Sequence, residues 1–264
     1  MRGPTRPDAV SSHVIRSLSL LAVLLPRLAL ADCSDWGVSV WPPLGRPLPA
    51  NGQLVIEGYG EFQEQVSRIA ERSPRLVADE DEVPLDLIAV YRGEKRLTQA
   101  VLQPERPLKP GMRYTLRLKK PVDTKVPVLR PEIESKGESL AMAWTVAPAD
   151  LTPPRWHEAP RTTGQKVVHF GCGPAIHVNV SAAVEDESSQ VQVLAEVTRA
   201  EGGVPVRFRL TPSEQQVHIG HGMCSGGFEL QEDVRYSVRL VAVDMAGNES
   251  AAPGGELLIQ GPKR

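Results

Sequence analysis

The chain has 264 residues, of which 41% are hydrophobic and 23% charged, a balance that supports a packed core and excludes a disordered chain. Its formal net charge is −2, so the composition gives no reason to expect nucleic acid as a partner. Glycine and proline number 22 and 24 and follow no three-residue period, which excludes collagen and predicts many turns and few long helices.

The first 31 residues have the features of a secretory signal peptide. Several arginines precede an apolar run of eight residues, 18–25, and the small-x-small sequence Ala29-Leu30-Ala31 follows it. Signal peptidase cleaves after such a sequence, and eight residues are too few for a membrane-spanning helix, which needs about 20. We therefore expect residues 1–31 to be removed. The mature chain would begin at Asp32, contain no transmembrane segment, and be secreted, periplasmic or part of the cell envelope.

Apolar and polar residues alternate through most of the mature chain, which is typical of antiparallel strands with one buried face. The alternation is clearest at residues 54–57, 85–91, 114–118, 142–146, 176–182, 191–197, 206–210, 236–242 and 257–259. Short strands at this spacing, with turn residues between them, predict an all-β protein built from sandwiches. Only residues 62–72 have helical spacing, with Phe62, Val66 and Ile69 on one face.

A proline-rich segment divides the mature chain into two parts of similar length. Residues 148–160 contain several prolines, and proline removes backbone donors and fixes φ, so this segment reads as a stiff connector. We therefore predict one β-sandwich domain at 32–147, a linker at 148–160 and a second domain at 161–264. Such a linker should leave the two domains free to unfold separately.

Two segments resemble the strand that carries a tyrosine in bacterial Ig-like and fibronectin type III domains. They are Tyr236–Ser250 (YSVRLVAVDMAGNES) and Leu108–Leu118 (LKPGMRYTLRL), and Pro49–Ile56 (PANGQLVI) resembles the opening of such a domain. The resemblance implies two tandem Ig-like antiparallel β-sandwiches. In the turn after the second segment, Gly247 permits a positive φ, and Asp244 and Asn248 are able to bond local backbone.

The mature chain contains three cysteines, Cys33, Cys172 and Cys224. Exported proteins meet an oxidising compartment, so we predict a disulfide between Cys172 and Cys224 in the second domain. Cys33 then remains unassigned. It could be free, could replace one partner of that bridge, or could link two chains.

Four histidines lie close to these cysteines in sequence: His169, His177, His218 and His221. Imidazole and thiolate together are ligands of zinc and copper, so one hypothesis is an envelope metal site. The simpler interpretation is a disulfide between two glycine-rich loops, FGCGP and HIGHGMCSGG, with solvated histidines beside it. We therefore predict no metal and no cofactor, and keep the four histidines as the alternative.

Acidic and aromatic residues give weaker signals. The acidic runs Asp79–Glu82 and Glu185–Glu187 lack a calcium-loop pattern and are predicted to be surface turns. The tryptophans are predicted to pack around the joint between the domains; they are Trp36, Trp41, Trp144 and Trp156.

The sequence contains no nucleophile elbow, zinc-protease motif or phosphate-binding glycine loop. It therefore predicts no enzyme activity and no catalytic residues. The leading hypothesis is an exported, non-catalytic Ig-like protein that binds a protein or glycan surface, or has a structural role, in the cell envelope or outside the cell. The alternatives are the metal-binding protein above and an accessory or inhibitor domain of a separate enzyme.

Overall fold

The structure, a computed structural model, describes residues 37–119, 132–135, 138–171, 173–188 and 190–263. The predicted signal at 1–31, Cys33, Trp36 and Cys172 therefore lie outside the described residues. Asp32–Arg264 form one compact unit. Within the described part, no helix is long and apolar enough to cross a membrane.

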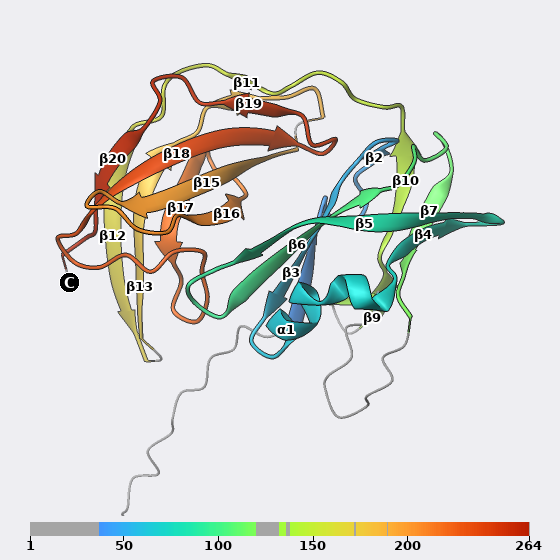
Figure 1. Ribbon diagram of the computed structural model, residues 1–264, viewed down its shortest axis with the longest axis horizontal. Coiled ribbons are helices and arrows are strands. Elements are labelled where there is room, and N and C mark those ends of the chain that lie inside the picture. Colours follow the sequence, from blue (N-terminus) through green and yellow to red (C-terminus); the bar gives the residue numbers. More distant parts are fainter. Residues whose placement is uncertain (1–36, 120–131, 136–137, 172, 189, 264) are drawn as a thin grey trace, which may run out of the picture. The chain divides into compact units, whose positions relative to one another are not determined.

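Strands dominate the fold, which confirms the all-β prediction (Figure 1). The first half contains β1 (Gly37–Trp41), β2 (Leu48–Pro49), β3 (Leu54–Tyr59), β4 (Arg75–Ala78), β5 (Asp81–Arg92), β6 (Leu97–Pro104), β7 (Arg113–Arg117), β8 (Glu132–Ser135), β9 (Glu138–Ala141) and β10 (Ala143–Ala147). The second contains β11 (Arg155–Trp156), β12 (Thr162–Phe170), β13 (Gly173–Ser181), β14 (Val184–Glu185), β15 (Val191–Arg199), β16 (Val206–Leu210), β17 (Gln216–His221), β18 (Arg235–Asp244), β19 (Glu249–Ala251) and β20 (Leu257–Gln260).

In the first half the strands follow the order β1-β3-β6-β5-β4-β7-β10-β2. The long strand β5 joins the two parts of this order, because residues 81–84 pair with β4 and residues 85–92 pair with β6 (Figure 1). Side chains from both parts meet in one buried core, among them Ile56 on β3, Leu102 on β6, Leu116 on β7 and Trp144 on β10.

The predicted helix at 62–72 is present in two pieces, α1 (Phe62–Ser67) and the 3₁₀ turn η1 (Ile69–Arg72). Phe62, Val66 and Ile69 are all buried, as their spacing predicts. Helix α1 packs against β3 and β6. The approach is close because of Gly58, where a Cβ atom would lie 2.7 Å from the Phe62 carbonyl oxygen.

The second half contains the sheet β12-β13-β17 and the sheet β16-β15-β18-β19, with β20 also paired to β18. Alternate residues of both sheets, including Val178, Ile219, Ala195 and Val238, fill a second core. The segment around β17 contradicts the prediction of a glycine-rich loop. Residues 216–221 form a strand because Val217 and Ile219 pack inward, while the loop begins only at Gly222.

Each half contains a tyrosine whose hydroxyl binds backbone five residues upstream. The Lys109 N–H donates to the Tyr114 hydroxyl at 3.3 Å, and the Gln231 N–H donates to the Tyr236 hydroxyl at 2.8 Å. This is the arrangement called a tyrosine corner in Ig-like sandwiches. The two tyrosines are 122 residues apart, and both stand in the pattern L-x₄-R-Y-x₂-R-L.

The two halves are joined by backbone pairing as well as by side chains. At the β5–β6 turn, the Lys95 N–H donates to the Gly226 carbonyl at 3.2 Å, and the Gly226 N–H donates to the Lys95 carbonyl at 2.8 Å. The Glu94 N–H also donates to the Gly227 carbonyl at 3.1 Å. Glycine at position 93 permits this approach, because a Cβ atom there would lie 2.6 Å from the Gly226 carbonyl oxygen.

Gln99 of β6 binds the backbone of β16 in the manner of a neighbouring strand. Its side-chain Nε2 donates to the Arg209 carbonyl at 2.8 Å, and its Oε1 accepts from the Arg209 N–H at 3.0 Å. Gln99 is fully buried. Nearby, Trp41, Val55 and Val101 of the first half form a small apolar cluster with Met245 of the second.

The proline-rich segment is bound to both halves near Asp150. The Asn51 side chain donates to the Asp150 carbonyl at 2.7 Å and accepts from the Asp150 N–H at 3.0 Å, and Asn248 donates to the same carbonyl at 3.2 Å. Further along, β11 pairs with β14. The segment is therefore packed against its neighbours, and the domain boundaries at 147 and 161 stay a prediction.

Candidate functional site

The predicted cysteine–histidine constellation lies on the sheet β12-β13-β17. Along β13, Ile176, Val178 and Val180 point into the core, so His177 and Asn179 point to the opposite face. The register of β13 with β17 places His218 beside Asn179 and Gly220 beside His177. His177 and His218 are thus diagonal neighbours on one face.

The two imidazole rings of His177 and His218 are in contact. Their centroids lie 5.0 Å apart, and the ring planes are tilted by 58°. The Nδ1 atom of His218 lies 2.9 Å from Oδ1 of Asn179. The pKa of His177 is lowered, first by its partial burial and then by His218, Lys166 and His221, which favours the neutral form of its ring.

The other two histidines lie elsewhere. His221 is opposite Ile176 and therefore points to the core side of the sheet, where it is 4% exposed. Its Nδ1 lies 3.1 Å from Nζ of Lys95 and 2.7 Å from the Gly222 carbonyl oxygen. His169 is exposed on β12, opposite Pro174. The fold therefore brings together His177 and His218 but does not gather all four rings.

The predicted disulfide joins Cys224 to Cys172, which lies outside the described residues. Cys224 is 2% exposed. The residues next to the two cysteines approach each other, since a Cβ atom at Gly173 would lie 4.0 Å from the Met223 carbonyl oxygen. The bridge between Cys172 and Cys224 remains a prediction, and this approach is compatible with it.

Three carboxylates that no sequence motif linked come together at the junction. Asp150, Asp186 and Asp244 each place an oxygen within 4.8 Å of the others. Among the described residues they form the one group of three or more potential metal ligands. They come from the proline-rich segment, the β14–β15 turn and the end of β18, so their sequence spacing carries no signal.

Local backbone bonds orient these carboxylates. Oδ1 of Asp244 accepts from the N–H groups of Ala246 and Asn248, both at 2.8 Å, which confirms the predicted turn with Gly247 at φ 85°. Burial raises the pKa of Asp244, and the charges of Asp150 and Asp186 raise it further. A cavity of about 530 Å³ lies beside the cluster, lined in part by Asp150, Arg46 and Met245.

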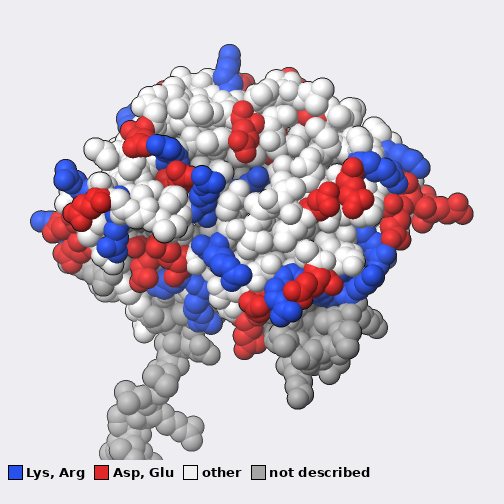
Figure 2. All heavy atoms as spheres, viewed as in Figure 1, with Lys and Arg blue, Asp and Glu red and all other residues white. Residues whose placement is uncertain are grey.

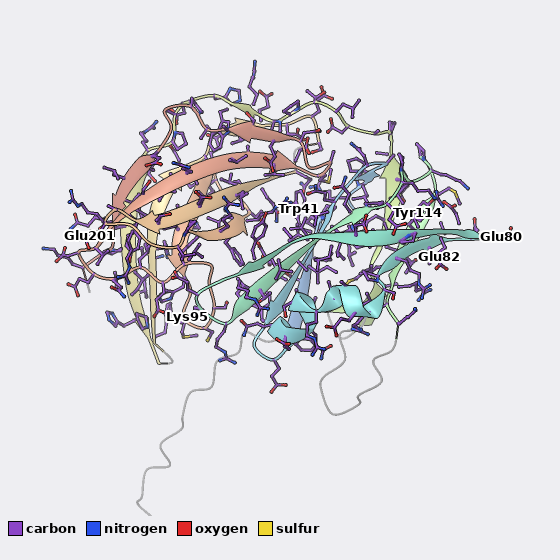
Figure 3. All side chains as sticks on the ribbon, viewed as in Figure 1. Trp41, Glu80, Glu82, Lys95, Tyr114 and Glu201 are labelled. Carbon is purple, nitrogen blue, oxygen red and sulfur yellow. The ribbon has the colours of Figure 1, made fainter. Side chains whose placement is uncertain are left out.

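Asp79 and Glu80 of the acidic run form the β4–β5 turn, as predicted, whereas Asp81 and Glu82 begin β5; Glu80 and Glu82 are labelled in Figure 3. Asp81 accepts a short hydrogen bond from the Tyr114 hydroxyl, and lies 2.8 Å from Arg106 and 3.4 Å from Lys109. The hydrogen bond from Tyr114 and those from the two cations lower the pKa of Asp81 to about 2. Glu82 pairs with Arg75 at 2.5 Å.

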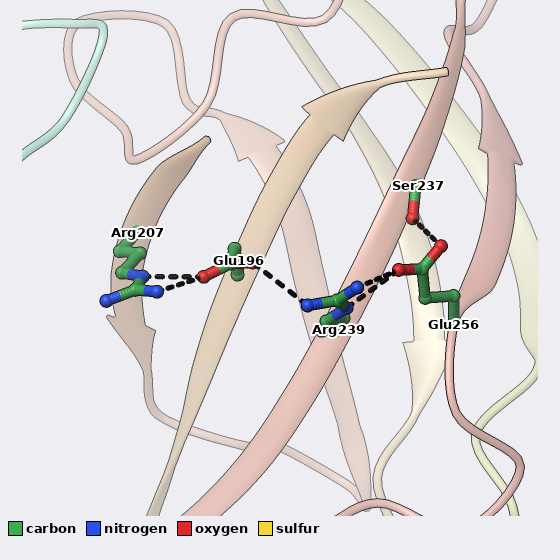
Figure 4. Close-up of polar contacts among 5 residues, drawn as sticks. All are labelled: Glu196, Arg207, Ser237, Arg239 and Glu256. Carbon is green, nitrogen blue, oxygen red and sulfur yellow. Dashed lines mark hydrogen bonds and ion pairs between the residues drawn. The ribbon is translucent and has the colours of Figure 1, made fainter. Parts of the chain in front are cut away.

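Charged side chains of both signs are interspersed over the face shown in Figure 2. On the sheet β16-β15-β18-β19 of the second half, charged side chains form a row that crosses β16, β15 and β18 and ends in the loop before β20 (Figure 4). Glu196 lies between Arg207 at 2.6 Å and Arg239 at 3.8 Å, and Arg239 also pairs with Glu256. Hydrogen bonds from Ser237 and Arg239 lower the pKa of Glu256. Such a row is typical of a solvated sheet surface.

The described tryptophans are packing residues. Trp41 lies in the junction cluster with Met245, as predicted, whereas Trp144 lies in the core of the first half and donates to the Pro42 carbonyl at 3.0 Å. Trp156 donates to the Ser250 carbonyl at 2.9 Å and packs against the second core. Each of these three rings therefore has a packing role, one at the junction and one against each core.

Comparison with known proteins gives no family assignment. No family model and no curated protein matches the chain. Among solved structures, it is similar to pullulanase type I from Bacillus subtilis str. 168 in complex with maltose, at 12% identity and a TM-score of 0.24, over 78% of this chain and 24% of that one. A pullulanase from Anoxybacillus sp. LM18-11 in complex with maltotriose gives 10% identity and 0.22, over 77% and 24%. The chain spans about a quarter of these proteins, and likenesses this low carry no argument.

Proposed function

We propose that this protein is an exported, non-catalytic module made of two Ig-like sandwiches, with a binding or structural role in the cell envelope or outside the cell. The strand orders support the sandwich part of the proposal. With β2, β8 and β9 left out and the other strands of the first half named A to G in chain order, the part β1-β3-β6-β5 of the strand order reads A-B-E-D and the part β4-β7-β10 reads C-F-G, which resembles the arrangement of immunoglobulin constant-type domains. In the second half, β12-β13-β17 corresponds to strands A-B-E of one sheet, and β16-β15-β18-β19 corresponds to strands C′-C-F-G of the other. This arrangement resembles fibronectin type III domains.

The observation that carries the proposed role is the junction between the halves. Lys95 and Gly226 pair through their backbones, and Gln99 holds the backbone of Arg209. Two sandwiches held in this way present one fixed surface, and a fixed surface loses less conformational entropy when a partner binds. The expected partner is a protein or a glycan at the cell surface.

The export part of the proposal is tested by N-terminal sequencing of protein recovered from the producing cells. We expect the chain to begin at Asp32 in the periplasmic or culture fraction. Recovery of an uncleaved chain in the cytosol would overturn it.

The binding part is tested with the immobilised mature chain and defined protein and glycan fractions of the envelope. We expect saturable retention of one fraction by the native chain and weaker retention by Gln99→Ala, in which the junction is loosened. Gln165→Ala, an exposed glutamine on β12, is the control. Turnover of an envelope substrate by the pure protein would contradict a non-catalytic role. Equal retention by the native chain, Gln99→Ala and Gln165→Ala would contradict a role for the junction in binding.

A further inference from the structure

We propose that His177 and His218 form a surface binding site for a late first-row divalent metal ion, of which Zn²⁺ is the probe used below. The site lies on the outer face of the sheet β12-β13-β17, whereas His221, which contacts Lys95 at the junction, is on the core side of the same sheet. The proposal therefore goes beyond the binding role above and does not depend on it.

The geometry of the two rings suits a shared ion. Imidazoles that coordinate one metal ion each place a nitrogen about 2.0–2.1 Å from it, so their rings must converge without stacking face to face. The centroid separation of 5.0 Å and the tilt of 58° exclude face-to-face stacking and are compatible with two nitrogens that converge on one ion. Two protein ligands leave the remaining coordination positions to water or to a ligand from a partner.

Asn179 sets the tautomer of His218. Its Oδ1 is an acceptor and lies 2.9 Å from Nδ1 of His218, so that Nδ1 carries the proton. The lone pair of His218 is then on Nε2, the atom on the far side of the ring from Asn179. Metal-binding histidines are commonly oriented in this way by a hydrogen bond from the other ring nitrogen to a carbonyl or carboxylate.

Gly220 lies directly opposite His177 on β17 and places no side chain beside the His177 ring. A Cβ atom there would lie 2.0 Å from the Ile176 carbonyl oxygen and 2.9 Å from the Cβ atom of His177. A side chain at this position would compete for the space beside the ring. On the other side of β13, Lys166 lies opposite His177. Its positive charge helps to keep the imidazole neutral and also weakens the attraction for a cation.

The experiment is a titration of the untagged mature chain with Zn²⁺ at pH 7.4, followed by the imidazole resonances in NMR spectra. We expect the signals of His177 and His218 to shift together and saturate at one ion per chain, while the signal of His169 stays in place. His177→Gln and His218→Gln should each abolish the saturable shift, and His169→Gln should leave it unchanged. Ca²⁺ should produce no shift, because imidazole is a poor ligand for hard cations.

Two further variants separate coordination from a general effect on folding. Asn179→Ala should weaken Zn²⁺ binding by about tenfold through the loss of orientation, and Lys166→Ala should tighten it. Lowering the pH to 5.5 should weaken binding, because protonated imidazole has no lone pair for the metal. The proposal fails if neither imidazole signal saturates at micromolar to low millimolar Zn²⁺. It also fails if the double variant His177→Gln/His218→Gln binds Zn²⁺ as the native chain does.

Discussion

The two halves contain the same tyrosine corner but place it in different electrostatic surroundings. Tyr236 accepts a hydrogen bond from the Gln231 N–H at the start of β18. Tyr114 accepts the equivalent bond from Lys109 and also donates to Asp81, which Arg106 and Lys109 contact as well. Burial and the hydrogen bond to Asp81 raise the pKa of Tyr114.

This difference shows that the same hydrogen bond between a tyrosine and the backbone has one structural role in the second half and two in the first. In the second half the corner fixes the chain entering β18. In the first half it also ties β7 to the β4–β5 turn, since Asp81 begins β5. The shared pattern around the tyrosines specifies the corner itself, whereas Asp81, which lies 33 residues before Tyr114, adds the second function.

The largest effect is expected where the two halves meet. Gln99→Ala removes the partner of both the N–H and the carbonyl of Arg209, which is 5% exposed. Each buried backbone group left without a partner costs about 1–3 kcal/mol, so we expect the loss of both partners to lower the free energy of unfolding by about 2–6 kcal/mol in total. Denaturant titration measures this change, with Gln165→Ala on the exposed strand β12 as the control.

The same variant tests whether the halves unfold separately. The proline-rich linker predicted two independent transitions, whereas the backbone pairing across the junction favours coupled unfolding. We now expect one calorimetric transition for the native mature chain and two for Gln99→Ala. Two well-separated transitions in the native chain would show that the junction contributes little coupling.

The two corners themselves are compared by removing each hydroxyl. Tyr114→Phe leaves Asp81 without its phenol donor, and hydrogen bonds to charged groups contribute about 1.5–3 kcal/mol. Tyr236→Phe loses a bond to a neutral N–H, which contributes about 0.5–1.5 kcal/mol. We therefore expect Tyr114→Phe to lower the unfolding free energy more. Equal losses in denaturant titrations would mean that the Asp81 contact is not stabilising.

The Asp81 contact also predicts a pH dependence of stability that originates in the first half. Its pKa is lowered from 3.8 to about 2, so its stabilising effect is present above the unfolded value and is lost as the pH falls between about 4 and 2. Asp81→Asn should lower Tm at pH 7, and the gap to the native chain should close over that range. A gap that is constant with pH would indicate lost packing instead of lost charge.

The sequence predicted those strands that have one wet face. β7, β13 and β18 alternate clearly, and their inward residues are buried as expected. β6 was missed because its residues are buried on both faces, one against the core of the first half and one against the second half at the junction. A strand that is covered on both faces needs no polar residues at alternate positions, so its sequence does not alternate between apolar and polar residues.

The candidate sites could be predicted only in part, because they depend on pairing between distant strands. The sequence singled out His177 and His218, but their contact follows from the register of β13 with β17. The glycines of HIGHGMCSGG predict a loop at 218–227, but residues 218–221 belong to β17, and Gly220 lets β17 approach β13. The acidic cluster joins three segments, and nothing in the local sequence of Asp150, Asp186 or Asp244 marks it.

The smallest effect is expected from the acidic cluster, where like charges oppose one another. The pKa of Asp244 is raised, so its ionised form is unfavourable in the folded state above its unfolded pKa, and this penalty is relieved as the pH falls through the folded value. Asp186→Asn keeps an oxygen for the Ser188 N–H and removes one of the repelling charges. We expect it to stabilise the chain by about 0.5 kcal/mol at pH 7, and the gain should shrink in acid. Asp86→Asn, which changes an exposed aspartate on β5, should show no such gain. A loss of stability in Asp186→Asn at pH 7 would mean that this carboxylate is a favourable partner in the junction, since repulsion from Asp244 would then be outweighed.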